Sequence, residues 1–145
     1  MQKITPFLWF DSQAEEAAKF YCSIFKDAKI LHTSPMIVTF EIMGQRFMGL
    51  NGGPRFKFTE AISFFINCKD QQEVDYYWDR LTSGGGEESM CGWLRDKYGL
   101  WWQVIPDALG ELMSGNDAAR AQRVMEAMLK MRKIDVAVLQ QAYNG

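Results

Sequence analysis

The stretch AISFFINCKDQQEVDYYWDRL, residues 61–81, decides the fold. Its opening, Ala61–Cys68, is almost entirely apolar and is typical of a buried β-strand. Asp70 then offers a carboxylate that can cap a helix. The apolar residues that follow share one face of that helix: Val74, Tyr77, Trp78 and Leu81. The stretch therefore predicts a strand followed directly by a helix.

The same order of elements is found near the N-terminus. Ile4–Phe10 predicts a buried strand, and Pro6 places its first residues at an edge or a bulge. Ser12 and Glu15 have the spacing of a capping box. Apolar residues then recur at helical spacing, which predicts a helix over Ala14–Phe25.

Short strands follow each of the two helices. After the first helix we expect three strands, the last two forming a hairpin around Gly44-Gln45: Lys29–Thr33, Met36–Met43 and Arg46–Leu50. After the second helix, which ends at Gly84–Gly86, two or three strands lead to Pro106, with a turn at Lys97-Tyr98-Gly99. Each half therefore contains a strand, a helix and about three strands, which indicates an internal repeat of βαβββ units.

The character of the chain changes after Pro106. Asp107–Ser114 predicts a short helix, and Asn116 or Asp117 can cap a longer one that runs to about Met131. Asp135 can cap a third helical segment. A methionine-rich apolar stripe on the longer helix is expected to pack on the body of the protein or on a second subunit, although a peptide-binding groove is the alternative.

Length and composition limit the class of protein. With 145 residues, 48% of them hydrophobic, the chain suits one domain, or two small halves that share a core. We expect a single domain over residues 1–145, made of modules over 1–58 and 59–106 and a helical extension over 107–145. The formal charge of -2 argues against a nucleic-acid partner, which requires a basic excess.

No apolar run approaches membrane-spanning length, and the first residues lack the pattern of a signal peptide, so we expect a cytoplasmic protein with no membrane partner. The three cysteines are far apart and odd in number, so no disulfide framework is expected. One histidine, His32, is too few for a histidine-rich metal site.

An ordered set of motifs points to a family: ITPFLWFD, AAKFYCSIF, GLNGGPRFKFTEAISFFINC, DQQEVDYYWDRL, CGWLRDKYGLWWQVIP and AMLKMRKIDVAVLQQA. The chain resembles the PhnB-like proteins of the glyoxalase, bleomycin-resistance and extradiol-dioxygenase (vicinal oxygen chelate) superfamily. Within it, the chain is most similar to the branch labelled 3-demethylubiquinone-9 3-methyltransferase. The resemblance implies an α+β fold of paired βαβββ modules that form a half-open barrel around a pocket, usually in a homodimer.

Metal-dependent relatives hold their ion with four side chains. Matched motif to motif, the resemblance places these near Pro6, Phe47, Ser63 and Gln103. Proline and phenylalanine have no donor atom, and a hydroxyl and an amide are poor ligands for Zn²⁺, Ni²⁺ or Fe²⁺. His32 lies in another segment. We therefore expect no metal site and no cofactor.

The methyltransferase label can be tested on the glycine-rich segments. Gly84–Gly86 follows a helix, and Asn51-Gly52-Gly53 follows a hairpin strand. Neither stands between a strand and a helix, where backbone N–H groups would hold a nucleotide-like cofactor. Both are expected to be turn glycines, so these residues do not support binding of S-adenosylmethionine.

The pocket residues follow from strand alternation. If Gln103 faces the cavity, Trp101 and Ile105 face it too, while Trp102 and Val104 pack under the helices. Counted from the matched positions Pro6 and Ser63, the same alternation adds residues from the other strands. This gives the predicted ligand-binding set: Leu8, Ser63, Phe65, Trp101 and Gln103. This mostly aromatic set, with one amide and one hydroxyl, suits a planar or hydrophobic small molecule.

Each of these residues also has a purely structural interpretation. Gln103 can be satisfied by neighbouring backbone or by Ser63, and Trp101 can be core. Glu41 is a candidate base and Cys91 a candidate nucleophile, but a solvent-facing carboxylate and an inert thiol explain them as well. We expect a homodimeric, metal-independent protein that binds a small molecule. The alternative is a metal-independent lyase, isomerase or transferase, including the labelled methyl transfer.

Overall fold

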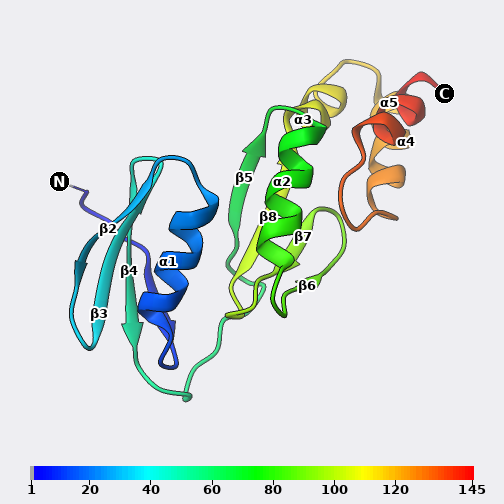
Figure 1. The fold of residues 1–145 in the computed structure, drawn as a ribbon. Helices are drawn as coiled ribbons and strands as arrows, with labels where there is room; N and C mark the ends of the chain where they lie inside the picture. The colour runs from blue at the N-terminus through cyan, green and yellow to red at the C-terminus, as the bar shows by residue number, and fades with distance from the viewer. Residues whose placement is uncertain (1) are drawn as a thin grey trace. The chain divides into compact units, whose positions relative to one another are not determined.

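The computed structural model describes residues 2–145 and divides the chain into two units. The first unit ends at Phe58, and the second spans Thr59–Gly145. Each unit contains one four-stranded sheet with its own helices (Figure 1). The two units are described separately below.

The first unit is one βαβββ module. In chain order, its elements are β1 (Phe7–Phe10), α1 (Ala14–Ile24), β2 (Ala28–Thr33), β3 (Ile37–Ile42) and β4 (Gln45–Asn51). The strands lie in the order β1-β4-β3-β2, with β1 parallel to β4 and the other neighbours antiparallel. The core lies between this sheet and the apolar face of α1, where Tyr21 stacks on Phe40 of β3.

The second unit repeats this plan. Its module consists of β5 (Phe64–Cys68), α2 (Gln71–Thr82), β6 (Glu87–Glu88), β7 (Trp93–Arg95) and β8 (Trp101–Pro106). The strand order is β5-β8-β7-β6, and again the first strand is parallel to the last. The internal repeat of βαβββ modules and the α+β class expected from the sequence are therefore confirmed.

Three helices complete the second unit: α3 (Asp107–Met113), α4 (Ala118–Met128) and α5 (Val136–Asn144). Asp117 caps α4 by accepting hydrogen bonds from two backbone N–H groups, and Asp135 caps α5 in the same way with one. A separate small core holds these helices to the end of β8: Ile105, Leu109, Val124, Ile134 and Leu139. The three predicted helices are confirmed, although α4 ends at Met128 rather than near Met131.

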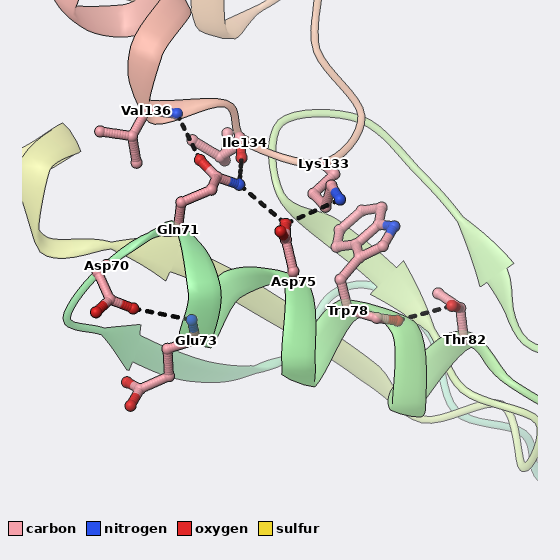
Figure 2. A network of polar contacts seen from close by, with 9 residues as sticks. All are labelled: Asp70, Gln71, Glu73, Asp75, Trp78, Thr82, Lys133, Ile134 and Val136. Carbon is pink, nitrogen blue, oxygen red and sulfur yellow. Dashed lines mark hydrogen bonds and ion pairs between the residues drawn. The ribbon is translucent and has the colours of Figure 1, made fainter.

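The C-terminal helices are also fixed to α2 by the side chain of Gln71 (Figure 2). Its Nε2 donates to the carbonyl oxygen of Ile134 and to Oδ1 of Asp75, both at 3.0 Å. Its Oε1 accepts from the backbone N–H of Val136 at 2.7 Å. Lys133 forms an ion pair with Asp75 at 2.9 Å, and the hydrogen bond from this ammonium lowers the pKa of Asp75. One amide thus joins two segments that are more than sixty residues apart.

Replacing Gln71 with leucine is expected to destabilise the second unit by about 1–3 kcal/mol, because a carbonyl and an N–H of the α4–α5 connection lose their partner. The free energy of opening that hydrogen exchange reports for the amides of α5 should fall by a similar amount, so these amides should exchange faster. Gln72→Leu is the matched control, since Gln72 is the next residue of α2 and is exposed. Equal exchange rates in α5 for the two variants would show that Gln71 does not hold the helices.

Two local predictions were wrong. Ser12 and Glu15 do not form a capping box; the N-cap residue of α1 is Gln13, and the N–H of Ala14 donates to Oδ1 of Asn51 at 2.8 Å. The parallel pairing of β1 with β4 brings Asn51 to the start of α1, which a local motif cannot reveal. The hairpin turn is Met43-Gly44 rather than Gly44-Gln45, with positive φ angles of 50° and 83°.

Candidate functional site

The sheet of the second unit has two different faces. Alternate residues pack against α2 and form a buried layer: Phe64, Ile66, Cys68, Leu94, Trp102 and Val104. In this layer, the ring of Phe64 lies 5.5 Å from that of Trp102. The residues between them point to the opposite side, which we call the open face: Ser63, Phe65, Asn67, Trp93, Arg95, Trp101 and Gln103.

Strand register places the open-face residues in rows. Gln103 of β8 stands between Phe65 of β5 and Trp93 of β7. In the adjacent row, Trp101 of β8 is paired with Arg95 of β7. Phe65 is 53% exposed, although it is one of the larger apolar residues of the sheet. The open face therefore presents aromatic rings around one amide.

The amide of Gln103 is bonded at one end only. Its Nε2 donates to Oγ of Ser63 at 2.9 Å, which is one of the two structural explanations that the sequence left open. Among the hydrogen bonds of residues 2–145, the other end of the amide has no partner, and the hydroxyl hydrogen of Ser63 has none either. Both side chains are half-buried. The pair therefore keeps one acceptor, Oε1 of Gln103, and two donors, the second amide N–H of Gln103 and the hydroxyl of Ser63, that the protein itself does not use.

The predicted facing of Leu8 is wrong. Leu8 is 7% exposed and shares a face of β1 with Phe10. A Cβ added to Gly49, the register partner of Leu8, would lie 3.3 Å from Phe10 and 3.4 Å from Ala14 of α1. Leu8 therefore points toward the helix. The alternation was counted from Pro6, which precedes the strand, and the opposite side of β1 carries Phe7 and Trp9.

Two further predicted positions point elsewhere. Phe47, matched to a metal-ligand position, is buried and stacks on Phe40 with ring centroids 5.4 Å apart, so it belongs to the core beneath α1. Ile105 does not extend the pocket lining; it packs into the small core of the C-terminal helices. Of the four matched positions, the structure thus joins Ser63 and Gln103 directly.

The two catalytic candidates, Glu41 and Cys91, belong to different units. Glu41 lies half-buried on the side of β3 opposite α1, between Lys29 of β2 and Arg46 of β4 in register. Cys91 precedes β7 with a positive φ of 60°, and its N–H donates to the carbonyl oxygen of Met131. The single histidine, His32, is exposed in β2 of the first unit.

Asp96 is a structural residue in the turn between β7 and β8. It is 1% exposed, and Oδ1 accepts hydrogen bonds from the N–H groups of Tyr98 and Leu100 at 2.9 and 3.1 Å. Its Oδ2 accepts from the indole N–H of Trp102 at 2.9 Å. One carboxylate thus fixes both the β7–β8 turn and the ring beneath the open face. Trp93 and Arg95 were missed as site residues, although their spacing around Leu94 was a readable signal.

Cys68, in the buried layer, is expected to be chemically inert. Burial, with smaller contributions from Glu73 and Asp107, raises the pKa of its thiol from 9.0 to about 12. Because the folded pKa lies above the unfolded one, this group stabilises the fold fully below pH 9.0 and loses that contribution as the pH rises toward 12. The difference in unfolding free energy between the wild type and Cys68→Ala should narrow over that range. A difference that widened would contradict the assignment.

Within residues 2–145, no group of three or more histidine, cysteine, aspartate or glutamate side chains is placed to hold a metal ion. The helices of the same part of the chain include none that is long and apolar enough to cross a membrane.

The family model for 3-demethylubiquinone-9 3-methyltransferase matches residues 2–105. The chain belongs to this family. A PhnB protein from Bacillus cereus, described as a 3-demethylubiquinone-9 3-methyltransferase, has a similar solved structure with 33% identity and a TM-score of 0.66. The match covers 72% of this chain and 99% of that one. No curated protein matches the chain.

More distant structures share the fold of the family. A protein from Pseudomonas aeruginosa has 18% identity and a TM-score of 0.62, over 73% of this chain and 98% of that one. The fosfomycin resistance protein FosX of Listeria monocytogenes, solved with Mn(II) and sulfate, has 17% identity and a TM-score of 0.56, over 73% and 91%. The glyoxalase and bleomycin-resistance fold is thereby confirmed. The family match ends at residue 105, so α3, α4 and α5 lie beyond it.

Proposed function

We propose that the protein binds a small, planar, largely apolar molecule on the open face of the second unit. The observation that carries the proposal is the half-used pair of Gln103 and Ser63 beside the exposed ring of Phe65 and the half-buried rings of Trp93 and Trp101. Aromatic side chains offer flat surfaces on which a planar ligand can stack. The free end of the amide and the free hydroxyl hydrogen can each form a hydrogen bond that fixes its orientation.

The proposal is tested by screening a library of aromatic fragments by calorimetry against the wild type and Gln103→Leu. We expect hits with the wild type to bind roughly tenfold more weakly to the variant, which corresponds to about one lost hydrogen bond. Gln140→Leu, an exposed glutamine of α5, is the control and should bind like the wild type. Hits that bind equally to all three proteins would place the ligand elsewhere.

A metal-independent enzyme is the second candidate, and Glu41 is the observation that favours it. Glu41 is half-buried and stands in register with Lys29 and Arg46, and a carboxylate held in a strand can act as a general base. The family description suggests methyl transfer to a quinone precursor, and S-adenosylmethionine is the expected methyl donor of such a reaction. The glycines give that cofactor little support: a Cβ on Gly52 would overlap the ring of Trp9, so this glycine serves packing.

The enzyme candidate is tested by calorimetry with S-adenosylmethionine and by turnover of Glu41→Gln. Absence of binding at millimolar concentration would exclude methyl transfer from this donor. A turnover that Glu41→Gln abolishes, with thermal stability unchanged, would favour the enzyme over the binding protein. Homodimerisation and a cytoplasmic location also remain proposals, and sedimentation at micromolar concentration tests the first of them.

A further inference from the structure

Arg95 places a positive charge on the open face. It is paired in register with Trp101, and its side chain is 39% exposed. Its Nη2 donates to Oε1 of Glu87 at 2.6 Å. A guanidinium has five N–H donors, and within residues 2–145 this is the contact that the Arg95 group makes. Most of its donors are therefore available beside an aromatic ring.

The neighbours of Arg95 make this charge distinctive. On β5, β7 and β8 the other residues of this face are neutral: Ser63, Phe65, Asn67, Trp93, Trp101 and Gln103. Glu87 of β6, the register partner of Arg95, shares the face and is negatively charged. Glu87, the counterion, is 67% exposed and lies on the two-residue edge strand β6. Ion pairs between exposed groups contribute little to stability, since both partners are well solvated. A ligand anion can therefore replace Glu87, or bind the unused side of the guanidinium, at small cost.

We infer that the ligand is a planar aromatic anion, with a carboxylate as the simplest form. This inference rests on the proposed function and adds the chemical class of the ligand. The ring stacks beside Trp101, a polar substituent meets the Gln103–Ser63 pair, and the carboxylate accepts from Arg95. A carboxylate matches the flat fork of a guanidinium, which holds it with two parallel hydrogen bonds. Glu87 acts as a competing carboxylate that the ligand must displace or share.

The inference is tested with matched probes: a series of aromatic carboxylates and the corresponding carboxamides, such as 2-naphthoate and 2-naphthamide. Calorimetric affinities are measured for the wild type, Arg95→Gln and Glu87→Gln, with indole NMR signals to confirm binding beside Trp101. We expect the wild type to prefer the carboxylates by roughly tenfold. Arg95→Gln should lose this preference while carboxamide affinity stays within about twofold, and Glu87→Gln should strengthen carboxylate binding by about twofold to fivefold.

Arg80→Gln is the matched control, because Arg80 is an exposed arginine of α2 that lies over the ring of Tyr76. It should leave both affinities unchanged. Equal affinity of the wild type for carboxylate and carboxamide would overturn the inference and leave the proposed function standing. A preference for carboxylates over carboxamides that persists in Arg95→Gln would show that Arg95 does not bind the ligand carboxylate. If no member of either series shifts the Trp101 signal, the proposed function fails, and this inference fails with it.

Discussion

Replacement of Asp96 by alanine is expected to lower the free energy of unfolding by about 3–5 kcal/mol, because three donors lose their acceptor at once. Two are backbone N–H groups of the β7–β8 turn, and the third is the indole N–H of Trp102. Asp96 is 1% exposed, so little solvent is at hand to replace the lost bonds. Urea denaturation followed by tryptophan fluorescence measures the effect.

Two further variants separate the contributions. Asp96→Asn keeps an oxygen for the turn but presents an amide N–H to the indole, so an intermediate loss is expected. Combined with Trp102→Phe, which removes the indole donor, Asp96→Asn should cost less than the sum of the two single changes. Asp79→Ala, an exposed aspartate of α2, is the surface control. A loss below about 1 kcal/mol for Asp96→Ala would contradict this account of the turn.

Gly92→Ala is expected to destabilise the second unit by about 2–4 kcal/mol, since strain at positive φ adds to overpacking. Gly92 has a φ of 83°, and an added Cβ would lie 2.7 Å from Cδ1 of Ile105 and 3.1 Å from Cγ1 of Ile134. The N–H of Gly92 also donates to the carbonyl oxygen of Arg132 at 2.8 Å. The variant therefore strains the site where β7 meets the C-terminal helices.

Gly110→Ala is the same substitution at a second glycine, and the opposite result is expected for it. Gly110 lies in α3 with nothing within 4 Å of the added Cβ, so alanine should be neutral or stabilise by up to about 1 kcal/mol. Thermal unfolding of the two variants gives a direct comparison. Similar melting temperatures would show that the space around Gly92 relaxes more easily than its contacts indicate.

The sequence was most informative where structure is local. Helix caps were predicted at Asp70 and Asp135, and at Asn116 or Asp117 for α4. Asp70, Asp117 and Asp135 each accept the expected backbone hydrogen bond. The repeated order of strand and helix predicted two modules, and both sheets show the same strand order. Local periodicity is sufficient here, because a cap or a helix face depends on residues a few positions apart.

The candidate site was predicted in part. Alternation along β8 placed Trp101 and Gln103 on the open face, and the Gln103–Ser63 bond was among the alternatives. The same reasoning failed for Leu8, because it was extended from Pro6, outside β1. Contacts between distant segments could not be predicted in this way. Asn51 accepts a hydrogen bond from the start of α1, thirty-seven residues away, and no local pattern encodes that contact. Ligand binding by the open-face residues remains a prediction.

The proposal that the open face binds a planar molecule is tested most directly by NMR of the five indole N–H groups during titration with a fragment hit. Trp93 and Trp101 lie on the open face. Trp78 is a buried residue of α2, and Trp102 lies in the layer of the sheet that packs against α2. We expect the Trp93 and Trp101 signals to shift with a single saturation curve while the Trp78 signal stays in place. Saturable binding that leaves Trp93 and Trp101 unmoved would contradict the account.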